Sequence, residues 1–287
     1  MKNKNSPNSP KDISSISMAT NNGANTHADF WNPNQYEKFK KERAQPFWDL
    51  AALVDWTGVH SFADLGCGTG ELTTELAIEK KITIAYGIDN SPSMLKKTES
   101  VISPVQFKNC DIEKFSLEGK FATDEQKLDL IFSNAALQWV PEHVTLLSNL
   151  HHWLRPDGQI AIQMPANFNQ PSHSLAELIA RDLFPDRGEN FIRKIPVLQP
   201  EDYSRLLFEL GFHNQIVRQQ IYPHLLEKSS DVIEWVRGTL LTHYEKVLSP
   251  ADFQSFLTRY SERLLQELGD ETPYLYTFRR TFIWGQK

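Results

Sequence analysis

Short apolar runs alternate with stretches of helical spacing through the first half of the chain. The runs are typical of buried strands, and they fall at 60–64, 82–88, 105–110, 128–133 and 159–164. The helical stretches between them lie near 70–80, 92–100 and 141–153. Alternation of this kind predicts an α/β fold, a doubly wound and mostly parallel sheet.

After Met164 this alternation breaks. Residues 165–198 are loop-like with helical pieces, 200–210 predict a helix that ends at Gly211, and 229–268 predict further helices. Two more strands, at 213–222 and in "YLYTFRRTFIWG", bring the expected sheet to seven strands. Long insertions after the late strands of an open sheet hang over the carboxyl ends of the strands, where ligands bind. We therefore expect a helical cap from insertions near 165–198 and 224–270.

The N-terminal segment differs in amino-acid composition from the rest of the chain. Residues 1–28 are rich in Asn, Ser and Lys and poor in large apolar side chains, which predicts a disordered tail before one domain at 29–287. Within that domain, Phe39, Phe47, Leu50 and Leu53 recur at helical spacing, interrupted by Pro46.

Composition narrows the possible partners and compartment. The net charge of −6 over 287 residues argues against a protein that binds nucleic acid through phosphate contacts. No apolar run has transmembrane length, and no apolar stretch follows the basic N-terminus, so we expect neither a membrane span nor a secretory signal. The two cysteines, Cys67 and Cys110, are too few for a disulfide framework or a zinc site, which predicts free thiols, a cytoplasmic location and no metal.

The stretch "FADLGCGTGEL" carries the first candidate chemistry. It reads D-x-G-x-G-x-G, with Asp64 followed by Gly66, Gly68 and Gly70. This is not the G-x-G-x-x-G spacing that receives a pyrophosphate, and Asp64 would repel phosphate charges. S-adenosylmethionine (SAM) has no phosphate, and its ammonium would be attracted by Asp64 while its carboxylate binds free N–H groups of the loop. The alternative is a tight structural turn, which the glycines alone would equally explain.

Two further acids follow at the ends of the next strands. Asp89, with Asn90 beside it, lies about 20 residues after the loop, where an acid meets a ribose diol. The alternative is that Asp89 only caps the next helix, although Ser91 suits that role. Asp111 follows the third strand, where it could accept from an adenine amine with the backbone of Ile112 nearby, or serve only as a turn residue.

The fourth strand ends in "LIFSNAALQWVPEH". Methyltransferases that act on adenine or glutamine amides usually carry an Asn-Pro-Pro-Tyr-type run at this place, and "SNAA" lacks it. Methylation of a planar amide or amine is therefore disfavoured.

These residues carry a family resemblance. The stretches "DFWNPNQYEKFKKERAQP", "FADLGCGTGEL", "GIDNSPSML", "LDLIFSNAALQWVPEH", "QIAIQMPAN" and "FPDRG" resemble trans-aconitate 2-methyltransferases, in order, across 29–190. Weaker similarity continues through "IEWV", "FLTRY" and "FRRTF". The resemblance implies a class I, Rossmann-like, SAM-dependent methyltransferase that forms the monomethyl ester of a small polycarboxylate, trans-aconitate being favoured.

The resemblance also implies roles for individual residues. A carboxylate is already a nucleophile at neutral pH, so no general base is needed, but a tricarboxylate needs cations, preferably arginines. The candidates are Arg43, Arg187, Arg193, Arg237, Arg279 and Arg280. Arg187 and Arg280 match arginines of the family pattern and are favoured. The residues expected to close over SAM and substrate are Trp31, Tyr36, Asn134 and Trp139, with Tyr36 and Arg43 on one helix face toward the methionine end of SAM.

One departure from the family pattern leaves the substrate open. Thr242 and His243 stand where family members often carry Arg-Pro, which removes one expected carboxylate partner. The acceptor could then be another dicarboxylate or a malonyl thioester on a carrier protein. Two hypotheses come from other functional classes: a SAM-binding regulator without catalysis, and an NAD-dependent dehydrogenase. As partners we expect a small carboxylic acid, no nucleic acid and no membrane, with the protein a monomer or weak dimer.

Overall fold

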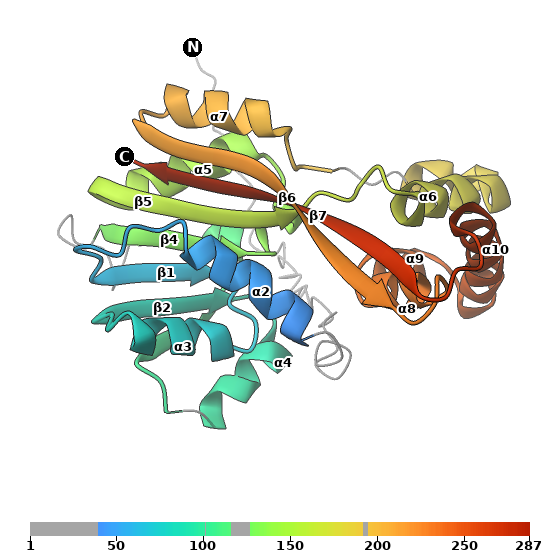
Figure 1. Cartoon of the computed structure of the whole chain (residues 1–287), viewed down its shortest axis with the longest axis horizontal. Helices are drawn as coiled ribbons and strands as arrows, with labels where there is room; N and C mark the ends of the chain where they lie inside the picture. The colour runs from blue at the N-terminus through green and yellow to red at the C-terminus, as the bar shows by residue number, and fades with distance from the viewer. Residues whose placement is uncertain (1–39, 101, 116–126, 192–194) are drawn as a thin grey trace, which may run out of the picture.

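The computed structural model describes residues 40–100, 102–115, 127–191 and 195–287 (Figure 1). The predictions made for the tail at 1–28, for Trp31, for Tyr36 and for Arg193 lie outside these residues. For Arg43 the structure describes the helical backbone but not the side chain.

Seven strands form one sheet, in the order β3-β2-β1-β4-β5-β7-β6 (Figure 1). Only β7 runs antiparallel to its neighbours β5 and β6, so the predicted mostly parallel, seven-stranded sheet is confirmed. The strands are β1 (Ser61–Leu65), β2 (Ile84–Asp89), β3 (Val105–Asn109), β4 (Leu128–Asn134), β5 (Leu154–Pro165), β6 (Asn214–Leu226) and β7 (Tyr274–Gln286).

Helices cover both faces of the sheet because the central strands are apolar on both sides. On one face, α2 and α3 pack on residues such as Phe62 and Phe132, and the rings of Phe47 and Phe132 lie 4.9 Å apart. On the other face, α5 and α7 pack on residues such as Ile131 and Ile283. The helices are α2 (Lys40–Ala51), α3 (Glu71–Glu79), α4 (Pro92–Leu95), α5 (His143–Trp153), α6 (Pro171–Leu183), α7 (Pro200–Glu209), α8 (Asp231–Arg237), α9 (Leu240–Val247) and α10 (Pro250–Leu268). Short 3₁₀ segments are η1 (Lys96–Ser100), η2 (Ile112–Lys114), η4 (Leu137–Trp139) and η5 (Pro185–Phe191).

Two sequence-based details differ from the structure. The helix α2 continues through Pro46, since a proline removes one N–H donor while Phe47 and Leu50 remain buried against the sheet. The helix α5 begins at His143 rather than at Pro141, because Glu142 takes a left-handed conformation at its N-cap. Within the described residues, no helix is both long and apolar enough to cross a membrane.

The helices α6, α8, α9 and α10 pack together beside the sheet and form what we call the cap (Figure 1). The long antiparallel pair β6 and β7 extends out of the sheet to carry it, with α8–α10 inserted between the two strands. Inside the cap, the rings of Tyr244 and Phe256 stack at 4.7 Å and those of Phe256 and Tyr260 at 5.8 Å. The apolar core of the α2 face continues into these residues without a break.

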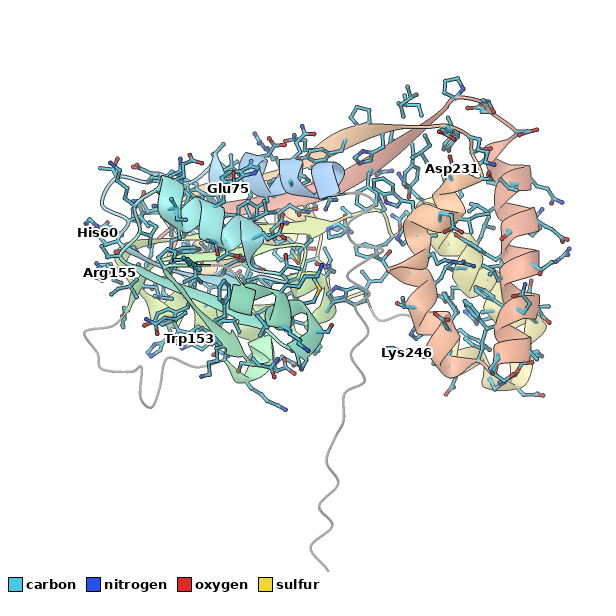
Figure 2. The ribbon with its side chains drawn as sticks, turned by 90° about the horizontal axis from the view of Figure 1, so that it is seen from below. His60, Glu75, Trp153, Arg155, Asp231 and Lys246 are labelled. Carbon is cyan, nitrogen blue, oxygen red and sulfur yellow. The ribbon has the colours of Figure 1, made fainter. Side chains whose placement is uncertain are left out.

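The cap lies beyond the carboxyl ends of the parallel strands. The opposite edge, marked by His60 and Arg155, faces away from it (Figure 2). At that far edge Asp129 accepts hydrogen bonds from the backbone N–H groups of His60 and Ser61 and pairs with Arg155 at 2.7 Å. The buried carboxylate there is fully used in joining β1 to β4.

At the carboxyl edge, the turn after β1 touches the turn after β4. Gly66 has φ +85°, and a Cβ built on it would lie 2.1 Å from Cβ of Ala136. Gly211, at the C-terminal end of α7, has a similar φ of +93° but nothing within 4 Å of its added Cβ.

Alanine substitutions at these two glycines separate the cost of backbone strain from the cost of steric overlap. We expect Gly66→Ala to lower the free energy of unfolding by about 1–3 kcal/mol more than Gly211→Ala, because both variants carry the positive φ but only the first forces the two turns apart. Urea unfolding of both variants measures the difference. Equal losses of stability would show that the two turns do not need this close contact.

Candidate functional site

Four polar side chains line the carboxyl edge of the sheet on the face that α2 covers. They are Asp64 of β1, Asn134 of β4, Gln163 of β5 and Arg280 of β7. The register places Asp64 beside Phe132, Asn134 beside Gln163, and Arg280 beside Pro165. Since alternate residues of a strand share a face, these four form a row across four adjacent strands. We call them the edge row.

Asp64 is buried, with 2% of its surface exposed. Its Oδ2 accepts a 2.5 Å hydrogen bond from the hydroxyl of Thr73, whereas Oδ1 has no hydrogen-bond partner among the residues that the structure describes. The pKa of Asp64 is raised to about 7, chiefly because burial disfavours the charged form; the Thr73 hydrogen bond opposes this rise and the nearby charge of Asp89 adds to it. A carboxylate left half-satisfied in this way favours a cation at Oδ1.

The backbone of the glycine-rich turn is less available than the sequence indicated. The N–H groups of Gly66 and Cys67 both donate to the carbonyl of Ile88, at 2.7 and 3.0 Å, and the N–H of Gly68 donates to Oδ2 of Asp89 at 2.8 Å. The N–H of Gly70 donates to the carbonyl of Cys67. The expectation that free loop N–H groups bind the SAM carboxylate is therefore wrong for these four donors.

Packing inside the protein accounts for two of the three glycines. A Cβ on Gly66 would overlap Ala136, and one on Gly70 would lie 2.5 Å from the ring of Phe107. A Cβ on Gly68 would meet only the flexible end of Met94, at 3.2 Å. The structural alternative for the glycines thus holds for Gly66 and Gly70, and the acids carry the argument for a ligand.

Asp89 ends β2 beside this turn. Its Oδ2 accepts from the N–H of Gly68 and its Oδ1 accepts from the N–H of Ser91, both at 2.8 Å. Ser91 caps α4 through the N–H of Met94, as predicted, so Asp89 is not the cap of that helix. Asn90 between them is exposed. The carboxylate of Asp89 is therefore held beside the glycine-rich turn, where the sequence predicts the ribose diol.

Asp111 and Ile112 follow β3 as expected. Asp111 caps η2 by accepting from the N–H of Glu113 at 3.1 Å, which is the turn role that the sequence left open. Ile112 lies beside the first turn, with Cδ1 3.9 Å from the position of a Cβ on Gly66. The structure thus brings the ends of β1, β2 and β3 into one group of acidic residues around the glycine-rich turn.

The segment after β4 supplies two more predicted residues. Asn134 is half-buried, and its Oδ1 has no hydrogen-bond partner in the described ranges. Ala135 follows with φ +56°, and its N–H donates to the carbonyl of Gln163. Trp139, at the end of η4, is 49% exposed. A large ring held at that exposure is available to contact a ligand.

Arg280 is the most deeply buried of the described arginines that the sequence proposed, at 5% exposed. Its guanidinium carbon lies 4.8 Å from the ring centre of Phe278 and 5.7 Å from that of Tyr222. Its Nη1 donates to Oε1 of Gln163 over a long 3.4 Å. The hydroxyl of Tyr222 donates to Asp49 at 2.6 Å, so its ring rather than its oxygen faces the cation.

Arg187 has a partner within the cap region. Its Nη2 lies 3.0 Å from Oδ2 of Asp252 on α10, and its guanidinium lies over the ring of Phe184. The hydrogen bond from Arg187 lowers the pKa of Asp252. Arg187 therefore joins η5 to α10 and lies outside the edge row. Its contact with substrate stays a prediction.

The other described candidate arginines, and the two residues that replace the family's Arg-Pro, lie outside the edge row. Arg237 is exposed and pairs with Glu234 on its own helix, and Arg279 is exposed on β7. Thr242 and His243 lie on α9, where the Thr242 hydroxyl donates to the carbonyl of Thr239 and the His243 ring packs edge-on against Tyr244. Among the described residues, no three His, Cys, Asp or Glu side chains are grouped as a metal site.

One buried histidine near the site was missed from the sequence. His143, the first residue of α5, contacts the carbonyl of Leu137 through Nε2 at 2.9 Å and the hydroxyl of Tyr203 through Nδ1 at 2.5 Å. Burial lowers the pKa of His143, which favours the neutral ring. A neutral ring with its proton on Nε2 donates to Leu137 and accepts from Tyr203, and Tyr203 in turn accepts from the N–H of Leu198. This chain of bonds holds η4, and with it Trp139, against α7.

Comparisons with known proteins show the family. A family model described as a methyltransferase domain matches residues 60–207. The trans-aconitate 2-methyltransferase of Deinococcus radiodurans is 38% identical over 260 residues, which cover 88% of this chain and 96% of that protein. The enzyme of the same name from Shigella flexneri is 36% identical over 260 residues, 90% of this chain and 98% of that protein.

A solved structure adds a likeness of fold alone. The YcgJ protein of Bacillus subtilis superposes with a TM-score of 0.51 at 15% identity, over 80% of this chain and 92% of that chain. The two sequence relatives are much more similar to this chain in sequence, and the matched residues cover nearly the whole length of each relative. The chain therefore belongs to the trans-aconitate 2-methyltransferase family.

Proposed function

We propose that this protein transfers the methyl group of SAM to one carboxylate of trans-aconitate and forms the monomethyl ester. The observation that carries the proposal is the edge row, which places a buried, half-satisfied acid (Asp64) and a buried arginine (Arg280) on one face of the same sheet edge. Two relatives that bear the name trans-aconitate 2-methyltransferase, at 36–38% identity, support the choice of substrate.

The residues present fit SAM. Oδ1 of Asp64 is a buried acceptor without a partner among the described residues, which suits the ammonium of the methionine moiety. Asp89 ends β2 beside the glycine-rich turn, at the place proposed for the ribose diol, and Asp111 with Ile112 lies at the next strand end for the adenine. When bound, SAM would supply an electrophilic methyl group on a sulfonium, and the acids Asp64, Asp89 and Asp111 at the neighbouring strand ends match its positive charge.

The chain's part in the reaction is to hold the acid and exclude water. An ionised carboxylate attacks carbon directly, and no proton has to move, so no residue is assigned as a general base. We assign Arg280 to a carboxylate of the substrate, and Asn134 and Trp139 to the region between substrate and SAM. Tyr36 and Arg43 keep their predicted place at the methionine end. Arg187 remains a predicted second cation, although its ion pair with Asp252 already gives it a role in holding the cap together.

Methyl transfer from labelled SAM tests the substrate. We expect turnover with trans-aconitate to exceed that with cis-aconitate, citrate, isocitrate or a malonyl-carrier protein, because the row offers fixed donors to an extended tricarboxylate. The enzyme is assayed with each acid at equal concentration, and the labelled ester is extracted and counted. Preference for the carrier protein would replace trans-aconitate as the substrate, and SAM binding without turnover on any acid would contradict an enzymatic function.

The pKa of Asp64 predicts how SAM affinity depends on pH. In the free protein this pKa is raised to about 7, and a bound ammonium requires the ionised form, so binding releases a proton whenever the pH is below that value. The affinity for SAM should therefore fall about eightfold between pH 7.5 and pH 6.0. Isothermal titration calorimetry at the two pH values measures this change.

The matched control is Asp64→Asn, which keeps the shape and cannot ionise. We expect it to bind SAM more weakly than the wild type at pH 7.5 and to show little change between the two pH values. Subtracting the variant's dependence also removes any contribution from SAM's own amino group. An equal pH dependence in both proteins would show that Asp64 does not bind the ammonium.

A further inference from the structure

We propose that Gln163 is a substrate-binding residue whose side-chain amide donates to the same carboxylate that Arg280 binds. The inference rests on the proposed function and extends it by naming a second donor and a fixed orientation for that carboxylate. Gln163 was not among the residues that the sequence singled out for the site.

The position of Gln163 follows from the strand register. It lies near the end of β5, paired with Asn134 of β4 on one side and with Phe282 of β7 on the other. Two residues further along the same pair of strands, Pro165 is opposite Arg280. Gln163 is fully buried, so whatever its amide contacts is held within the protein or brought by a ligand.

The chemistry of Arg280 fixes which way the amide points. A guanidinium only donates hydrogen bonds, so the Gln163 atom that faces Nη1 of Arg280 at 3.4 Å must be the oxygen. The NH₂ group then points away from Arg280, and Nε2 has no hydrogen-bond partner within the described part of the chain. A buried donor without an acceptor is destabilising, and such groups in native proteins usually meet water or a ligand.

The missing partner is best supplied by an anionic oxygen. The NH₂ of Gln163 and the guanidinium of Arg280 are both donors, they lie on neighbouring strands, and one of them is charged. A carboxylate has two oxygens that accept from two such donors at once. The long Gln163–Arg280 contact also leaves room to tighten when a ligand orders both side chains.

A second glutamine on the same strand shows that this arrangement is specific to the carboxyl edge. Gln159 lies four residues earlier, on the same face of β5, and is equally inaccessible to solvent. Its Oε1 accepts from Trp284 at 2.8 Å and from the N–H of Asp55 at 3.0 Å, and its Nε2 donates to the carbonyl of Asp55 at 2.6 Å. All of its hydrogen-bonding atoms are used to join elements of the fold.

Steady-state kinetics with Gln163→Met and Gln163→Glu test the inference. Methionine has nearly the same shape and no donor, and glutamate keeps an oxygen for Arg280 while replacing the NH₂ by a second oxygen. We expect Gln163→Met to raise the KM for trans-aconitate about 10- to 100-fold, with kcat and the KM for SAM changed less than about threefold. Gln163→Glu should raise the substrate KM further, because its charge repels the carboxylate and neutralises Arg280.

The matched control is Gln159→Met, a loss of the same amide on the same strand. We expect it to lower the melting temperature and to leave the KM for trans-aconitate unchanged. Thermal melting and binding of S-adenosylhomocysteine to each variant establish that it is folded. If Gln163→Met is too unstable to assay at the working temperature, its KM for trans-aconitate is compared with that of the wild type at a lower temperature at which the variant is folded.

The outcomes separate this inference from the proposed function. A wild-type enzyme that methylates trans-aconitate, together with Gln163 variants of unchanged substrate KM, would overturn the role of Gln163 and leave the function intact. That result would mean that a structural water satisfies the amide. A wild-type enzyme that methylates none of the acids would overturn the proposed function, and the role of Gln163 would fall with it.

Discussion

The cost of burying a hydrogen-bonding group without a partner governs this structure. Each such group destabilises a fold by about 1–3 kcal/mol, so most are paired. At the edge of the sheet that faces away from the cap, Asp129 and Gln159 follow this rule completely. At the edge that faces the cap, Asp64, Asn134 and Gln163 each keep a buried polar atom without a hydrogen-bond partner among the described residues. Such atoms also occur elsewhere, as at the hydroxyl of Thr281 on β7, but these three lie together on one face of one sheet edge, where a ligand could complete their hydrogen bonds.

The topology explains how these groups come together. Parallel strands β1, β4 and β5 deliver their carboxyl ends to one edge, and β7, which runs the other way, brings Arg280 from its middle to the same place. The extension of β6 and β7 then carries the cap helices beyond that edge (Figure 1). Acids gather around the glycine-rich turn on one side and the arginine lies on the other, and we propose that the first group holds the cationic cofactor and the second the anionic substrate.

The sequence predicted what depends on local order and missed what depends on pairing across strands. The seven strands and the acids at the ends of β1, β2 and β3 could be inferred because each motif is contiguous. The expectation of free loop N–H groups was wrong for four donors, and for three of them, Gly66, Cys67 and Gly68, the acceptors Ile88 and Asp89 lie about 20 residues away on the next strand. Gln163 and His143 were missed because their partners, Arg280 and Tyr203, are distant in sequence. Arg187 matched the family pattern, but its contact with Asp252 is visible only in the fold.

The claim that these unpaired atoms await ligands is tested most directly by a crystal structure with S-adenosylhomocysteine and trans-aconitate bound. The account predicts the amino group of the cofactor product within about 3.2 Å of Oδ1 of Asp64, and one substrate carboxylate within the same distance of Nε2 of Gln163 and the guanidinium of Arg280. A structure in which both ligands bind and these atoms still have no partner, or in which ordered water satisfies them, would contradict it.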